Sequence, residues 1–319
     1  MNFPLFPPGA STVARETDAL YWGLIGISTL VVILVFGAII FFCFKYRRGK
    51  LAQRSPQRLP AMTIELTWTI LPTLIFLGFF AWGADLYWNI ERQPADALEL
   101  HVIGKQWMWK VEHAQGNREI NELHVPVGRV VRLTLASQDV IHSFFLPAFR
   151  IKQDVVPGRY TSIWFKADRI GKFHLFCSEY CGTHHSAMRG TVHVMPPAAF
   201  EEWLIQGQPG TTLAQAGERV FRQYGCSGCH VNSTTVRAPP LEGLYGRPAP
   251  LQDGRIVVAD EAYLRDSILL PAKDITAGYT NDMPSFQGHI SEEELVEVIA
   301  YLRSLSGTTP GKEANEAKR

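Results

Sequence analysis

The sequence lacks an excess of charge of either sign, since its 31 lysines and arginines are balanced by 30 aspartates and glutamates. A net charge of +1 therefore gives no indication of nucleic-acid binding. Cysteine is also scarce, and five residues in 319 are too few for a disulfide scaffold. We recognise no internal repeat, so a solenoid or a propeller is not indicated. The length itself indicates about two domains.

Two runs near the N-terminus contain no charged residue, namely residues 19–44 and 66–84. Each is long enough to cross a bilayer as a helix, and neighbouring helices can tolerate Pro72 in the second run. The first run is too long for a signal-peptide core and no basic segment precedes it, so we interpret it as a retained helix. Neither run contains histidine, and these helices therefore cannot ligate a haem–copper centre.

The basic residues around these runs predict their orientation. The intervening segment 45–65 contains six lysines and arginines, whereas residues 1–18 contain only Arg15. Basic loops stay in the cytoplasm, so we expect a transmembrane hairpin over 19–88 with both termini outside. Residues 1–18 and everything after about residue 89 would then be extracytoplasmic.

The remainder divides into an all-β part and a helical part. Residues 97–195 contain short alternating runs rich in β-branched and aromatic residues, separated by turn signals, which predicts a sandwich or barrel within a domain at 89–205. A linker is expected at 206–211. Residues 212–306 are predicted to be helical, with a capping-box match at 291–294. The polar tail 307–319 is expected to be disordered.

A cluster of soft ligand types lies in the β part, at Cys177, Cys181, His185 and Met188. Such ligands favour copper or another late metal over magnesium or calcium. A disulfide and a zinc site of two cysteines and two histidines are alternatives. Methionine, however, suits copper and is not a usual ligand of structural zinc.

Two thiolates can bridge two copper ions, each of which then needs one terminal imidazole. His142, just past a predicted strand, is the best candidate for the second imidazole. Spacing alone does not separate His185 from His184. The other histidines have no motif support, and we expect them to be packed or solvated: His101, His113, His124, His174, His193 and His289.

The helical part carries a second metal signature, Cys226-x-x-Cys229-His230, which predicts covalent attachment of a c-type haem. Met283, between a turn-like segment and a proline, is the candidate for the second axial ligand. A thioether there raises the haem potential, which suits electron delivery to an oxidase. The alternative role for Met283 is ordinary core packing.

Together, the two spans, the sandwich and the ligand motifs resemble cytochrome c oxidase subunit II, with its binuclear copper (CuA) centre in a cupredoxin fold, over about residues 15–205. The resemblance implies that His185, and not His184, is a ligand. It also implies that Glu179 binds copper through its backbone carbonyl and reaches a magnesium site shared with the catalytic subunit. The implied copper ligands are His142, Cys177, Glu179, Cys181, His185 and Met188.

Residues 212–305 resemble a class I cytochrome c, and the whole chain resembles bacterial oxidases whose subunit II carries its own cytochrome c. This second resemblance implies that the Pro239 carbonyl holds the other ring nitrogen of His230. It also implies a contact between terminal helices through Gly217, Phe221 and Tyr301.

Two further residues match positions of the oxidase family. Trp107 resembles the tryptophan that passes electrons from cytochrome c, although it could equally be a core or interface aromatic. Glu65 matches the glutamate at the cytoplasmic mouth of the family's proton channel, and the alternative for it is a solvated charge at a helix end. Phe144 departs from the pattern, because relatives often carry tryptophan there.

The resemblance therefore implies the electron-entry subunit of a proton-pumping terminal oxidase in a bacterial inner membrane. Electrons would pass from the haem through two coppers to catalytic subunit I, which reduces oxygen to water. Subunit III, membrane lipid, and cytochrome c or another periplasmic donor are the other expected partners. The alternative is the electron-entry subunit of a copper-containing nitric oxide reductase. A copper-delivery protein is disfavoured by the fixed ligands and the haem, and a quinol oxidase subunit would lack the copper ligands.

Overall fold

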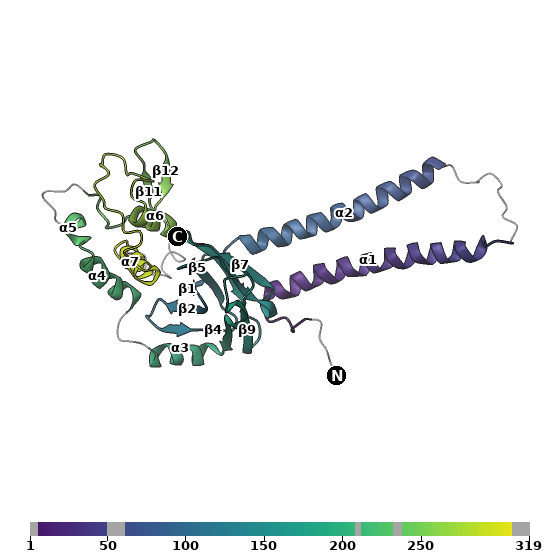
Figure 1. Ribbon diagram of the computed structural model, residues 1–319, viewed down its shortest axis with the longest axis horizontal. Helices are drawn as coiled ribbons and strands as arrows, with labels where there is room; N and C mark the ends of the chain where they lie inside the picture. The colour runs from purple at the N-terminus through teal and green to yellow at the C-terminus, as the bar shows by residue number, and fades with distance from the viewer. Residues whose placement is uncertain (1–5, 50–60, 208–211, 232–237, 308–319) are drawn as a thin grey trace, which may run out of the picture. The chain divides into compact units, whose positions relative to one another are not determined.

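A computed structural model of the chain describes residues 6–49, 61–207, 212–231 and 238–307 (Figure 1). The chain forms two units. One is the helical segment Thr12–Gln93, and the other contains Met1–Ser11 and Pro94–Arg319.

The helical segment consists of α1 (Thr12–Lys45) and α2 (Ala61–Glu91). Both helices are long and apolar enough to cross a membrane, and they contain the two uncharged runs of the sequence. Pro72 lies inside α2, close to Thr73, whose hydroxyl donates to the Thr69 carbonyl at 2.7 Å. Three of the loop arginines and lysines that predicted the orientation lie outside the described residues: Lys50, Arg54 and Arg58.

The second unit begins with a β-sandwich of two five-stranded sheets, which confirms the predicted fold class. The first sheet has the order β3-β2-β1-β5-β8, with bounds β3 (Arg118–Ile120), β2 (Met108–His113), β1 (Leu98–Lys105), β5 (Val130–Ser137) and β8 (Thr161–Lys166). The second has the order β4-β10-β9-β6-β7, with bounds β4 (Glu122–Pro126), β10 (Arg189–Met195), β9 (Gly171–Cys177), β6 (His142–Leu146) and β7 (Ile151–Val155).

Alternating apolar residues explain how the two sheets pack. The inward-facing side chains of both sheets form a fully buried core that includes Trp109, Leu133, Phe144, Phe165 and Leu175. Two strand pairs are parallel, β1 with β5 and β4 with β10, whereas the other pairs in these sheets are antiparallel. A rigid sandwich of this kind holds the loops at its end in fixed positions.

The C-terminal region is helical, as expected, and contains α4 (Leu213–Gln223), α5 (Ser227–His230), α6 (Glu261–Leu269) and α7 (Glu292–Ser304), with α3 (Pro197–Gln206) leading into it. Ser291 and Glu294 form the expected capping box. Helices α4 and α7 approach so closely that a Cβ added at Gly217 would lie 1.8 Å from the Glu297 carbonyl oxygen. One element differs from the expected all-α region, a short hairpin of β11 (Pro248–Pro250) and β12 (Ile256–Val258).

Helix α7 also contacts the sandwich within this unit. Ile103 of β1 is buried with Leu213 and Val296. Ion pairs surround this apolar contact and join the two regions: Lys110–Glu293, Arg118–Glu297 and Arg303–Glu99. Apolar residues and partly buried ion pairs thus connect the helical region to the sheet that carries β1.

Candidate metal centres

The soft ligand cluster is assembled by strand pairing in the second sheet. Cys177 ends β9, and the loop that follows returns to the strand at Met188, whose carbonyl accepts from the Cys177 N–H at 3.1 Å. His142 begins β6, and β6 pairs with β9 so that Phe144 lies opposite Cys177. This pairing brings an imidazole that is distant in sequence to the cysteine loop.

The two sulfur atoms occupy the middle of the cluster, with Cys177 Sγ 3.8 Å from Cys181 Sγ. His142 Nδ1 lies 3.9 Å from the first sulfur and His185 Nδ1 lies 3.5 Å from the second. Met188 Sδ is 3.8 Å from Cys181 Sγ. A disulfide has an S–S bond of about 2.05 Å, so the cysteines are free thiols in this structure.

A backbone oxygen completes the donor set, because the Glu179 carbonyl lies 3.3 Å from Cys177 Sγ. Glu179 itself is an exposed residue. Two thiols, two imidazoles, a thioether and a carbonyl exceed the four ligands that tetrahedral zinc takes. The soft sulfur donors are those that copper prefers, and the residues of this cluster therefore fit copper.

The electrostatics of the two thiols favour binding of a cation. Burial raises the pKa of the Cys177 thiol, but hydrogen bonding to His142 and to backbone groups outweighs burial and lowers that pKa to about 6. Burial raises the pKa of Cys181 to about 12, and the neighbouring Cys177 thiolate adds to this effect. The second cysteine therefore ionises when a cation compensates both charges, and metal binding releases its proton.

Asp139 supports this cluster, although the sequence did not single it out. Its Oδ1 lies 2.8 Å from His142 Nε2, and its Oδ2 accepts from the Gln106 N–H at 2.7 Å. Gln106 in turn donates its side-chain N–H to the Cys181 carbonyl at 2.7 Å. A carboxylate on the far nitrogen fixes the tautomer of a ligating histidine. The signal that could have found Asp139 is its position three residues before His142.

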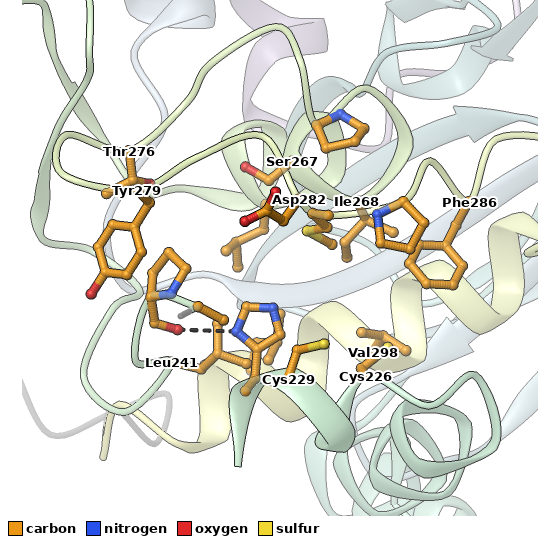
Figure 2. Close-up of a pocket in the computed structure, with 18 of the residues that line it drawn as sticks. Cys226, Cys229, Leu241, Ser267, Ile268, Thr276, Tyr279, Asp282, Phe286 and Val298 are labelled. Atoms are coloured by element: carbon orange, nitrogen blue, oxygen red, sulfur yellow. Dashed lines mark hydrogen bonds between the residues drawn. The ribbon is translucent and has the colours of Figure 1, made fainter. Parts of the chain in front are cut away.

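The haem motif lies on and beside the short helix α5, where the His230 N–H bonds the Cys226 carbonyl at 3.1 Å. Cys226, Cys229, His230 and Met283 line one largely apolar cavity, and Figure 2 shows its labelled cysteines near Val298. His230 Nδ1 bonds the Pro239 carbonyl at 3.0 Å, the dashed line in Figure 2, which leaves Nε2 for iron. These residues fit a covalently attached c-type haem.

Comparisons with known proteins agree with both centres. Residues 1–82 match a family model described as the transmembrane domain of cytochrome c oxidase subunit II, and residues 81–195 match the periplasmic domain of the same subunit. The chain belongs to the cytochrome c oxidase subunit II family. Residues 214–306 match a cytochrome c family model, so a haem domain follows the copper domain in this chain.

Two sequence relatives support the same assignment, and one solved structure is similar to part of the chain. Cytochrome c oxidase subunit 2 of Alkalihalophilus pseudofirmus is 30% identical over 297 residues, covering 88% of this chain and 84% of that protein. The same subunit of Cereibacter sphaeroides is 31% identical over 247 residues, covering 65% of this chain and 80% of that protein. A crystal structure of the periplasmic domain of subunit II from Bradyrhizobium japonicum is 34% identical and has a TM-score of 0.35, covering 36% of this chain and 95% of that one.

Family membership gives this chain its coarse role as an integral membrane subunit of a cytochrome c oxidase. The copper-domain and cytochrome c-domain matches imply copper and haem as its cofactors. Other oxidase subunits are implied as its partners.

The two family residues outside the metal clusters have different surroundings. Trp107 is half-buried, and its ring meets that of His184 edge-on with centroids 4.7 Å apart. His184 therefore packs on the tryptophan, whereas His185 faces the sulfur pair. Glu65 lies exposed near the beginning of α2. Phe144, the departure from the family pattern, is fully buried against Trp109 in the core.

Proposed function

We propose that this chain is the electron-entry subunit of a proton-pumping terminal oxidase. Electrons pass from a c-type haem on Cys226 and Cys229, through a binuclear copper centre on Cys177 and Cys181, to the catalytic subunit that reduces oxygen to water. The observation that carries this proposal is the pair of sulfur atoms, each of which has an imidazole nitrogen within 4 Å. The same chain has a largely apolar cavity lined by Cys226, Cys229 and His230.

When bound, the copper pair and the haem supply one-electron carriers, and the chain's own residues keep the surroundings of these carriers fixed. Asp139 and the Pro239 carbonyl each hold the far nitrogen of one imidazole. The pairing of β6 with β9 fixes the distance between His142 and the cysteine loop. A site whose ligands are held in this way reorganises little between redox states, which favours rapid electron transfer.

The proposed ligand set is that of the family: His142, Cys177, Glu179, Cys181, His185 and Met188 for copper, with His230 and Met283 as the haem axial pair. The exposed Glu179 side chain is available for a magnesium ion shared with catalytic subunit I. Trp107, packed beside the cysteine loop, is proposed as the electron-entry residue for an external donor such as cytochrome c.

The proposed topology puts both metal domains on the periplasmic side of a bacterial inner membrane. Glu65, near one end of α2, is then on the cytoplasmic side as the entrance residue of a proton channel. Subunit III and membrane lipid are further proposed partners. The linker proposed at 206–211 and the tail at 307–319 lie largely outside the described residues.

Metal analysis with spectroscopy of the purified oxidase tests the proposal. We expect two coppers and one haem per copy of this chain, a paramagnetic resonance signal with seven hyperfine lines, and low-spin c-haem absorption bands. One copper per chain, zinc in its place, or a bond between Cys177 and Cys181 in the loaded protein would overturn it. Turnover of nitric oxide instead of oxygen would favour the reductase alternative.

A further inference from the structure

A second group of metal-binding side chains lies on the sandwich, apart from the cysteine loop. Strands β4 and β10 pair in parallel with His124 directly opposite His193. Their imidazoles therefore stack, with centroids 4.3 Å apart and planes inclined by 12°. Glu122 precedes His124 by two residues, so it projects from the same face of β4. One ligand atom from each of these three residues lies within 4.8 Å of the other two.

The orientation of His124 is fixed from behind by a buried carboxylate. Glu119 Oε2 lies 2.5 Å from His124 Nδ1, and its other oxygen accepts from the His124 backbone N–H at 3.0 Å. His113, itself fully buried, holds the same carboxylate at 2.8 Å. Carboxylates support metal-ligating histidines in this manner, and the arrangement leaves His124 Nε2 to face a ligand.

His193, in the same group of three residues, has a buried ring nitrogen that lacks a hydrogen bond in the described part of the chain. Its Nε2 is buried and has no hydrogen-bond partner among the described residues, and the Glu122 carboxylate is 3.9 Å away. Buried ring nitrogens are normally bonded, so this atom calls for an explanation. If His124 and His193 had only a structural role, that role would explain the contacts of Glu119 with His124. It would not explain why His193 Nε2 lacks a partner beside the exposed Glu122 carboxylate.

We propose that Glu122, His124 and His193 bind one divalent cation of the zinc type. Two imidazoles and a carboxylate are a common ligand set for Zn²⁺ that keeps a further position for water. Most of the Glu122 side chain is exposed, with a relative accessibility of 56%, and it provides a route of entry for the ion. Glu119 is a positioning residue, because it acts through His124.

The site can be tested on the intact, copper-loaded and haem-loaded oxidase by equilibrium dialysis against Zn²⁺. Saturating the cysteine cluster with copper beforehand makes the result independent of how that cluster functions. The reference is a double variant, Glu122→Gln with His193→Ala, which lacks two of the three proposed ligands. We expect the parent oxidase to bind one more zinc ion per copy of this chain than this double variant. Each single substitution should weaken the affinity at least tenfold, and the exposed His289→Ala serves as a matched control without effect.

A fluorescence measurement gives an independent readout. Trp203 stacks on the other face of His124, with centroids 4.5 Å apart. Cu²⁺, used as a probe of the same site, should therefore quench the emission contributed by Trp203, and Trp203→Phe should remove most of this quenching. Glu122→Gln changes an exposed side chain and should fold normally, which its thermal melt checks. Equal zinc binding by the parent and both single variants would overturn the proposal, as would the absence of any zinc beyond that of the double variant.

Discussion

Replacing Asp139 by asparagine is the sharpest test of how the sandwich supports the copper ligands. The carboxylate accepts from the Gln106 N–H through one oxygen and faces His142 Nε2 through the other. Oδ1, which faces His142, also accepts from the Val140 N–H at 2.7 Å, so the two backbone N–H groups bond different oxygens. An amide retains only one acceptor oxygen, and we consider the orientation in which this oxygen accepts from the Gln106 N–H. Its NH₂ group would then oppose the Nε2–H of His142. The imidazole would have to move its proton to Nδ1, the nitrogen that faces Cys177.

The expected loss follows from the role of such carboxylates. Removing a residue that orients a ligating histidine weakens metal binding by about 10- to 100-fold, equivalent to about 1.4 to 2.8 kcal/mol. Burial lowers the pKa of His142, but Cys177 and Asp139 together raise it, so the variant should also have a lower His142 pKa in the copper-free protein.

The assay is a chelator titration of the purified protein, followed by the copper-dependent absorbance, with the haem bands as an internal reference. Asp139→Asn should release copper at a chelator concentration about 10- to 100-fold lower than the parent. Asp253→Asn is the matched control, because Asp253 bonds Arg255 on an exposed loop of the haem domain. An unchanged copper midpoint in Asp139→Asn, with normal folding, would refute the assigned role of this carboxylate.

Two further predictions concern stability. Burial raises the pKa of Glu112 to about 7, nearby Glu297 adds to this, and Arg118 opposes it. Because this value lies above the ordinary 4.5, the buried charge destabilises the fold increasingly from pH 4.5 to 7. Glu112→Gln should therefore raise the free energy of unfolding by up to about 3 kcal/mol at pH 8 and leave it unchanged near pH 4, measured by denaturant titration; equal gains at both pH values would contradict this. Gly217→Ala would bring its Cβ against the Glu297 carbonyl, so α4 and α7 must separate. It should destabilise the haem domain by about 1–3 kcal/mol or more, seen as a lower Tm of the haem absorbance, and an unaltered Tm would disprove the close contact.

The sequence predicted a β-rich region over residues 97–195, because apolar alternation indicates short strands locally. Cys177, Cys181, His185 and Met188 could be found together because they belong to one loop. His142 could be named only as the best candidate, since its approach to the cysteine loop depends on the pairing of β6 with β9, and the choice of His185 over His184 needed the family resemblance.

The features that the sequence did not reveal depend on tertiary contacts. The stacking of His124 on His193 is one of them, because nothing local indicates that their strands run side by side in parallel. The hairpin of β11 and β12 was likewise missed, since both strands are only three residues long and β11 begins and ends with proline. Short strands of this length have too few residues for a recognisable alternation.

The antiparallel register of β6 and β9 has a consequence for biogenesis. Successive side chains on a strand point to opposite faces, so a slip of one residue would turn the first imidazole of the copper cluster away from the cysteine loop. A partly folded chain would thus offer thiols without their complete complement of donors. Tight copper binding at the proposed site would therefore require the correct register of β6 and β9.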